Sequence, residues 1–573
     1  MEFFLPVYGF VKFSDAERLV IDHPAFQRLG KVYQLAQTHL VFRGATHTRL
    51  EHAMGVCHIA GEMIKSVNEN TAHLRDVPSR HENRPNSWVL GEPLSEHETA
   101  FIRLAALLHD IGHIPFGHTL EDEVEVIQRH HDGWDRVNQI LDKKNWGSGY
   151  QGASLREIID QAYRTDLANS ANSQRRGRAH NGGFRPSDLL MLILCAKDEH
   201  RIQARSRFSD NTVFRLDVYR HIVADTICAD LLDYLQRDWY HIGKVRAIDS
   251  RLFQYMQIRR PPEASSPEQD RFVISLGERP RLKTDAVSMI LTLLESRYEL
   301  WQVVLLHRVK LAATAMLERS IQELISSQVS GRGTTGHSRP VLDSEELEAF
   351  LLRNSDEQAL AFLEDLSRPN PPAYRLLSLL RQRRIYNTVY DCQHDELSTE
   401  QFLRLDDLYG KRRIGGQRRL EVARLLERDF QLISGSLAIY CVPMKLTEAK
   451  LPKVSLHVDG LVAKFQEWEH HGHGISSCGA IEAQERRFKR LWRISFFLAE
   501  DEKERLESQG LLGVLTTAIQ HLAVGLPVQN ETLLQASRRL AQRVFTGLTL
   551  RSELEGDYQR YPTGAPTLLS WRA

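Results

Sequence analysis

The stretch FIRLAALLHDIGHIPFGH, residues 101–118, determines much of the predicted fold and site. Its first eight residues are apolar apart from one arginine, which is typical of a helix packed in a protein core. Gly112 and Pro115 predict that this helix ends here, with the polar side chains of His109 and Asp110 at its C-terminal end. Buried polar groups need a partner, and a metal ion is a good one. We therefore predict a mainly α-helical fold with a metal site at this helix end.

Polar residues on both sides of this stretch fit the same site. The loop after the helix supplies His113 and His118. Upstream, the segment THTRLEH (46–52) places Arg49 and His52 three residues apart, and therefore on one face of a helix. A cation beside a metal ligand suits a phosphate group that is held against the metal.

A third block, ADLLDYLQRDW (229–239), has a polar stripe at helical spacing, opposite leucine and tryptophan side chains. The stripe consists of Asp230, Asp233, Tyr234, Arg237 and Asp238. By itself this pattern is more typical of an ordinary amphipathic surface helix than of a functional site.

The dipeptide His-Asp occurs three times, at 109–110, 131–132 and 394–395, but only the first follows a strongly apolar helix. The histidine-rich run EHHGHG (469–474) lacks a framework of carboxylates or cysteines, which favours a flexible loop over a metal site.

The three blocks together resemble the HD-domain deoxynucleoside triphosphate triphosphohydrolases, in particular their SAMHD1-like branch, over roughly residues 5–312. The resemblance implies an HD-domain helical core followed by a C-terminal α+β region. It also implies a metal pattern of two histidines and two aspartates, on His52, His109, Asp110 and Asp230.

The resemblance also implies roles for other residues. For the substrate, these are Gln34 and Leu35 beside the sugar and base, Arg49 on the α-phosphate, Tyr234 against the 2′ position, Asp238 accepting from the 3′-hydroxyl, and Arg297 on a phosphate. For catalysis, His118 would stand at the scissile bond, supported by His113 and by Glu121, where the family has an aspartate.

This chain departs from the family pattern at several positions. Leu231 replaces a lysine after the metal aspartate, Leu305-Leu306 replaces a Tyr-Gln pair before His307, and no counterpart of a final catalytic histidine exists near Leu141. In the activator site Asp22 and Gln27 match guanine-reading positions, but Gly30 replaces an arginine. These departures leave open how the triphosphate is bound, which base is preferred and whether a guanine nucleotide activates the protein.

The implied function is metal-dependent hydrolysis of deoxynucleoside triphosphates by water attack at the α-phosphorus, giving deoxynucleoside and inorganic triphosphate. A site of imidazoles and carboxylates suits Mn, Fe, Zn or Ni, and Mg where oxygen ligands dominate. Two alternatives stay open: a phosphodiesterase or nuclease acting on cyclic or oligomeric nucleotides, and a nucleotide-sensing protein with a degenerate site.

Along the chain, we predict a core at 1–327, a linker or loop at 328–342, and a C-terminal region at 343–573 that serves regulation or oligomerisation. Residues 344–432 are expected to be helical, whereas SGSLAIYCVPMKL and FKRLWRISFFLAE have the alternation of strands.

The composition limits the expected partners and cellular location of the protein. Lysine plus arginine and aspartate plus glutamate both number 74, so bulk charge does not predict a nucleic-acid or membrane partner, although nucleic acid stays open. Six cysteines without a CxxC pair and no long apolar run favour a cytoplasmic protein without membrane contact. Family analogy adds a homo-oligomer, an allosteric nucleotide and a role in antiviral defence.

Overall fold

The chain starts with an antiparallel hairpin, β1 (Glu2–Leu5) and β2 (Gly9–Lys12), ahead of helix α1 (Asp15–Ile21). Ser14 and Glu17 form a capping box that fixes where this helix begins. This computed structural model describes residues 1–75, 86–117, 119–120, 133–146, 152–172, 185–195, 215–264, 266–278, 281–330, 344–410, 412–444, 447, 455–465, 467, 480–525 and 535.

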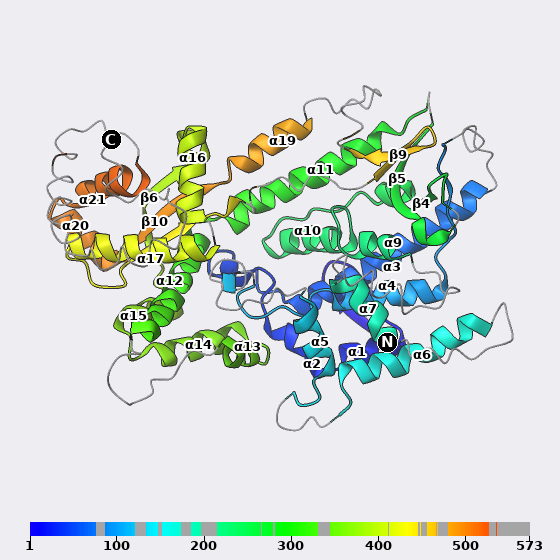
Figure 1. The fold of residues 1–573 in the computed structure, drawn as a ribbon, viewed down its shortest axis with the longest axis horizontal. Coiled ribbons are helices and arrows are strands. Elements are labelled where there is room, and N and C mark those ends of the chain that lie inside the picture. Colours follow the sequence, from blue (N-terminus) through cyan, green and yellow to red (C-terminus); the bar gives the residue numbers. More distant parts are fainter. Residues whose placement is uncertain are drawn as a thin grey trace.

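Three helices meet at the centre of the N-terminal part: α3 (Arg49–Arg75), α4 (Glu96–Leu108) and α10 (Ala229–His241). Helix α3 buries a run of small and aliphatic side chains, and α4 is buried along most of its length. The predicted apolar helix is confirmed, because α4 ends at Leu108 with His109 as its C-cap. In Figure 1, α3, α4 and α10 lie close together, with α11 (Thr284–Leu300) on the outer side of α10.

Further helices complete this part of the chain. They are α2 (Pro24–Gln27), η1 (Arg28–Lys31), η2 (Ala36–Leu40), α5 (Trp134–Asp142), α6 (Leu155–Asn172), α7 (Pro186–Cys195), α9 (Leu216–Val223), η4 (Ser250–Tyr255), η5 (Pro267–Gln269) and the π-helical turn η6 (Trp301–Leu305), which leads into α12 (Arg308–Ser330).

A five-stranded sheet in the order β3-β4-β5-β8-β9 joins distant parts of the sequence. Its first three strands are β3 (Val89–Leu90), β4 (Met256–Arg260) and β5 (Arg271–Gly277), whereas β8 (Ser455–Val458) and β9 (Leu461–Lys464) come from the C-terminal region. Strand β8 pairs in parallel with β5, and the other neighbours are antiparallel.

The C-terminal region is built from helices around a second sheet, whose order is β6-β10-β7. Its remaining elements are α13 (Ser344–Leu351), α14 (Asp356–Ser367), α15 (Pro371–Arg381), β6 (Asn387–Gln393), η7 (His394–Glu396), α16 (Thr399–Leu405), η8 (Asp406–Gly410), α17 (Arg412–Asp429), β7 (Leu437–Cys441), α19 (Ala480–Lys489), β10 (Arg493–Leu498), α20 (Glu500–Ser508), α21 (Leu512–Ala518) and η10 (Ile519–Val524).

The predicted strands are confirmed in β7 and β10. The expectation of continuous helix over residues 344–432 is wrong, because β6 interrupts it. Strand β6 pairs with β10 about a hundred residues later in the chain, and no local pattern reveals such a pairing.

Helix α12 joins the two parts of the chain. Its buried Arg319 forms ion pairs with Glu323 on the same helix and with Glu427 on α17, and it donates to the carbonyl of Leu437 at the start of β7. Apolar residues from both parts of the chain belong to one continuous core cluster. The division at residues 327 and 343 remains a prediction, and α12 makes buried contacts with elements beyond it.

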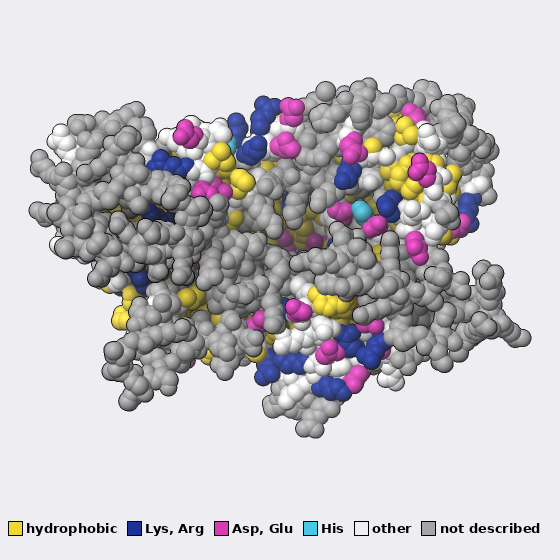
Figure 2. Space-filling model, viewed as in Figure 1, with side chains coloured by type: hydrophobic (Ala, Val, Ile, Leu, Met, Phe, Trp, Pro, Cys, Tyr) yellow, Lys and Arg dark blue, Asp and Glu magenta, His cyan; other side chains and the backbone are white. Residues whose placement is uncertain are grey.

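Charges of both signs are interspersed over the described surface in Figure 2, in keeping with the balanced composition. Within the described residues no single helix is long and apolar enough to cross a membrane. One bent pair, Thr284–Leu305 with Arg308–Ser326, passes the test of length and composition together, at an angle of 63°.

Helices α3 and α10 approach closely at Gly55. A Cβ atom built on Gly55 would lie 1.9 Å from Oδ1 of Asp233 and 2.2 Å from Nη2 of Arg237, both of which are buried. Only glycine fits at this contact without displacing the pair.

We therefore expect Gly55→Ala to destabilise the fold by about 1–3 kcal/mol, the usual cost of overpacking, although alanine normally favours a helix. The matched control is Gly30→Ala, whose Cβ would meet Leu50 at an ordinary 3.4 Å. Urea unfolding of both variants measures the effect. Equal stability of the two variants would contradict the close packing of α3 on α10.

Candidate active site

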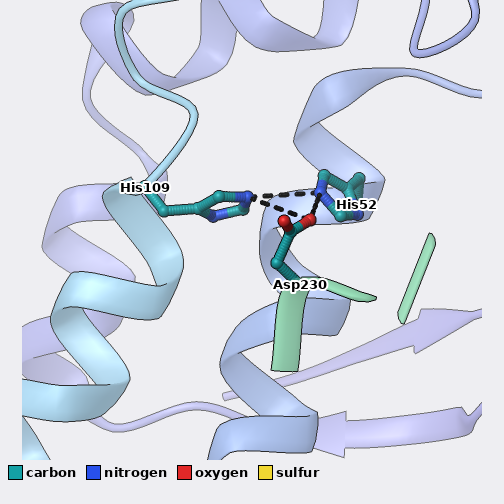
Figure 3. Close-up of side chains that lie close together, drawn as sticks. All are labelled: His52, His109 and Asp230. Atoms are coloured by element: carbon teal, nitrogen blue, oxygen red, sulfur yellow. Dashed lines mark hydrogen bonds and ion pairs between the residues drawn. The ribbon is translucent and has the colours of Figure 1, made fainter. Parts of the chain in front are cut away.

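Three ligand atoms converge where α3, α4 and α10 meet. His52 comes from the first turn of α3, His109 from the end of α4, and Asp230 from the first turn of α10. Nε2 of His52 lies 3.2 Å from Nε2 of His109 and 3.2 Å from Oδ1 of Asp230, and Nε2 of His109 lies 3.8 Å from the same oxygen. Figure 3 shows the three side chains pointing at one another from separate elements. Their ligand atoms all lie within 4.8 Å of one another, as in a metal site.

The hydrogen bonds behind the two imidazole rings fit a metal between them. Nδ1 of His52 is 2.8 Å from Oδ2 of Asp233, and Nδ1 of His109 is 2.8 Å from the carbonyl of Ala106. Both partners are acceptors, so each Nδ1 carries a proton, and each Nε2 can offer a lone pair to a metal that displaces any proton there. Two lone pairs and a carboxylate in contact repel one another unless a cation lies between them. The donor set therefore fits a divalent metal of the kind that binds nitrogen and oxygen ligands.

Asp110, the fourth predicted ligand, lies beside this cluster. Its Oδ2 accepts from Nη1 of Arg49 at 2.6 Å, and its Oδ1 is 3.4 Å from Nε2 of both His109 and His113. Burial alone would raise the pKa of Asp110, but His109, His113 and Arg49 hold it well below its usual value. Its Oδ2 also lies 3.8 Å from Nε2 of His52, so Asp110 is an ionised carboxylate that faces both histidines of the cluster, and its role as a ligand stays a prediction.

Asp233 supports His52 from behind. Its carboxylate, which is fully buried, accepts from His52, from Arg237 through two nitrogens, and from the hydroxyl of Tyr8 at 2.7 Å. Burial would raise the pKa of Asp233, but Arg237 and His52 lower it, so the group stays ionised. Burial would lower the pKa of His52, but the hydrogen bonds to Asp230 and Asp233 raise it to about 10. A metal at Nε2 therefore competes with a proton there.

A second buried pair lies further along α10, where His47 contacts Asp238 through Nε2 and Oδ1 at 2.9 Å. Residues 32–34 run beside 47–49, and the backbone amide of Gln34 donates to the carbonyl of His47. Oε1 of Gln34 is buried and makes no hydrogen bond within the described part of the chain. The expected sugar-binding residues Gln34 and Asp238 are thus joined through His47. Sequence reasoning missed His47, although its place two residues before Arg49 was a usable signal.

Tyr234 and Arg297 lie close enough for the charge of Arg297 to affect the pKa of Tyr234. Burial raises the pKa of Tyr234, Arg297 opposes the shift, and Asp230 and Asp238 add to it. Trp239 donates to the hydroxyl of Ser296 at 3.0 Å, which fixes α11 against α10. Arg297 is buried, and its Nε has no hydrogen-bond partner among the described residues. The polar stripe of α10 therefore lies largely inside the protein, and the alternative of a surface helix is wrong.

Several sequence predictions fall outside the described residues. These are His118, Glu121, the pair at 131–132 and the run at 469–474. The predicted Leu35 is buried beside Gln34. Among the departures from the family pattern, Leu231 and Leu141 are packed in the apolar core, and Leu305 ends the π-helical turn η6.

The loop after the cluster has a strained backbone. Phe116 has a φ of +66°, although it carries a side chain, and Gly117 follows with +56°. A non-glycine residue in this region costs about 1–3 kcal/mol, so surrounding contacts must hold it in place.

Comparison with known proteins agrees with this geometry. The model of the family described as HD domain matches residues 49–162, which include His52, His109 and Asp110. Residues 49–162 of the chain therefore match an HD domain. Asp230 lies beyond the matched segment and completes the cluster from α10.

Relatives of this HD-domain chain carry a common description, deoxynucleoside triphosphate triphosphohydrolase SAMHD1. The protein of Danio rerio is 26% identical over 43% of this chain and 35% of its own length, and the homologue of Dictyostelium discoideum is 26% identical over 44% and 38%. The Homo sapiens protein is 30% identical over 22% of this chain and 18% of its own length. The matches thus span well under half of these relatives. A solved structure of a phosphohydrolase from Bacteroides thetaiotaomicron has a TM-score of 0.49 at 17% identity, over 87% of this chain and 100% of that chain.

We expect Asp233→Asn to weaken metal binding about 10- to 100-fold, the usual effect of removing the partner of a histidine ligand. The amide has no negative charge and only one acceptor oxygen, so it cannot keep all the hydrogen bonds to His52, Arg237 and Tyr8, and the imidazole ring is held less firmly. Titration calorimetry with Mn²⁺ measures the affinity. The control is Asp249→Asn, because Asp249 is exposed and pairs with Arg251. An equal affinity in the two variants would remove Asp233 from the metal site.

Proposed function

We propose that this chain is a metal-dependent phosphohydrolase that converts deoxynucleoside triphosphates into deoxynucleoside and inorganic triphosphate. The observation that carries the proposal is the succession of polar groups along α10. Asp230 belongs to the metal cluster, Tyr234 follows one turn later, and Asp238 follows one turn after that. Such spacing suits a phosphate, a sugar ring and a sugar hydroxyl in the same order.

The reaction would take place at the cluster of His52, His109 and Asp230. A divalent ion held by His52, His109 and Asp230, with Asp110 beside them, would make a nucleophilic water available near neutral pH and polarise a phosphoryl oxygen. The ion would be Mn, Fe, Zn or Ni, which suit a mixed set of imidazoles and carboxylates, or Mg where oxygen ligands dominate.

Two arginines would hold the phosphate groups. Arg49 is buried beside Asp110 at the edge of the cluster, so its positive charge would be fixed near an α-phosphate that is bound there. Arg297, near Tyr234, would bind a phosphate further along the chain of the triphosphate. His118 is our candidate for the group that gives a proton to the departing 5′-oxygen.

The sugar would lie between α10 and the segment at 32–34. The ring of Tyr234 would occupy the space of a 2′-hydroxyl, and Asp238 would accept from the 3′-hydroxyl. His47 orients Asp238 from behind, and Gln34 offers its Oε1 to a donor on the substrate. Regulation by a nucleotide and assembly into a homo-oligomer are part of this proposal through the similarity to SAMHD1 proteins.

Analysis of the products tests the proposal. The purified protein is incubated with each dNTP and NTP, singly and in mixtures, with Mn²⁺ or Mg²⁺, and the products are separated by ion-exchange chromatography. Inorganic triphosphate with deoxynucleoside supports the proposal. Monophosphates released from cyclic or oligomeric nucleotides would favour the phosphodiesterase or nuclease, and binding without turnover would favour the nucleotide sensor.

Discrimination between sugars gives a sharper prediction. We expect Tyr234→Ala to narrow the ratio of kcat/KM for dNTP over NTP by about tenfold or more, because it removes the bulk that excludes a 2′-hydroxyl. Tyr234→Phe is the matched control, since it keeps the ring and should keep the ratio. Asp238→Ala should weaken both kinds of substrate alike. An unchanged ratio in Tyr234→Ala means that the sugar does not lie against this ring.

A further inference from the structure

A carboxylate from the C-terminal region reaches two loops of the candidate active site. Asp356 is the first residue of α14 and is buried. Its Oδ2 accepts from the backbone amide of Tyr33 at 2.9 Å, and its Oδ1 accepts from the backbone amide of Phe116 at 2.8 Å. The two donors are 323 and 240 residues away along the chain.

Both donors stand next to residues of the candidate site. Tyr33 precedes Gln34 and pairs with Thr48, the neighbour of Arg49. Phe116 lies in the loop that follows His109, at the positive φ that needs support from its surroundings. One side chain therefore bridges the backbone of the proposed sugar-binding segment and the backbone of the loop after the metal cluster.

Asp356 is not the residue that caps its own helix. Ser355 is the N-cap of α14 and forms a capping box with Gln358, so the helix begins without help from Asp356. Burial raises the pKa of Asp356 to about 6, against the opposing effect of its two amide donors. A buried carboxylate is unfavourable unless it is hydrogen-bonded, and the donors that the described part of the chain supplies to Asp356 are backbone amides of the two loops.

The same loop has a second link to the C-terminal region. Glu348 on α13 pairs with the buried Arg136 of α5 at 2.8 Å, and Nη1 of Arg136 donates to the carbonyl of Gly112 at 3.4 Å. Helices α13 and α5 lie near each other in Figure 1. Two carboxylates beyond residue 343 thus act on the backbone of residues 112–116, one directly and one through Arg136.

We propose that Asp356 is a positioning residue of the HD site, which holds the loop at 112–117 and the segment at 32–35 in their working geometry. The α13–α14 segment is then part of the active site and not a separate module. The nature of the substrate in this inference rests on the proposed function, whereas the positioning itself does not.

The test compares Asp356→Ala and Asp356→Asn with Glu357→Gln in the full chain. Glu357 is the next residue and also contacts Tyr33, but through the phenol hydroxyl at the surface, so it is a matched control. Amide hydrogen exchange, bound Mn²⁺, and kcat and KM for dNTPs are measured on each. Binding of inorganic tripolyphosphate in the presence of Mn²⁺ is measured by calorimetry.

In Asp356→Ala we expect the amides of Tyr33 and Phe116 to exchange at least tenfold faster, with Mn²⁺ content unchanged. We expect kcat to fall about 10- to 100-fold, as for a displacement of about 1 Å near the reacting groups. Asp356→Asn keeps one acceptor and should lie between alanine and wild type. Glu357→Gln should behave as wild type in every measurement.

The outcomes separate the two proposals. If the wild type hydrolyses no dNTP, the proposed function fails, and amide exchange with tripolyphosphate binding still tests the positioning. Unchanged exchange and unchanged tripolyphosphate binding in both Asp356 variants would overturn the positioning role. Loss of kcat in proportion to a lower melting temperature, without intermediate behaviour of Asp356→Asn, would assign Asp356 to stability alone. Should the alanine variant fail to fold, the asparagine variant decides between these outcomes.

Discussion

The carboxylate of Asp233 is the interaction on which the geometry of the site depends. A buried charge is tolerated only when it is paired and hydrogen-bonded, and Asp233 receives donors from Arg237, Tyr8 and His52. These donors come from α10, from the turn of the N-terminal hairpin and from α3. The pairing therefore fixes three elements at once, and the glycine at position 55 allows α3 and α10 to approach closely enough for it.

The ligand set follows from this constraint. Because Nδ1 of His52 donates to Asp233, Nε2 of His52 is directed at His109 and Asp230. The lysine expected after Asp230 is Leu231, which is buried in the core. Among the described residues, Arg49 is a buried cation beside Asp110, and Arg237 is held by Asp233. This departure makes the substrate class the most informative question about the site.

Local sequence pattern was sufficient where a single element carries the signal. The apolar run before His109 predicted α4 and its end, and helical spacing placed Arg49 with His52 on α3 and grouped the polar residues of α10. It failed where partners are far apart in sequence, because periodicity reports which face of an element is buried and not what covers it. Strand β6, the pair of His47 with Asp238 and the reach of Asp356 are all of this kind. The family resemblance supplied roles for single residues, but it supplied none for His47 or Asp356.

The parallel pairing of β5 with β8 has a consequence for the synthesis of the chain. Every described residue of the candidate site up to Arg297 leaves the ribosome before Ser455, the first residue of β8. At about 5–20 residues per second, β5 waits roughly 10–30 s for its neighbour, with one edge unpaired. An unpaired strand edge invites pairing with other nascent chains. During synthesis the edge of β5 is therefore exposed for a time, and a chaperone would have this edge to bind.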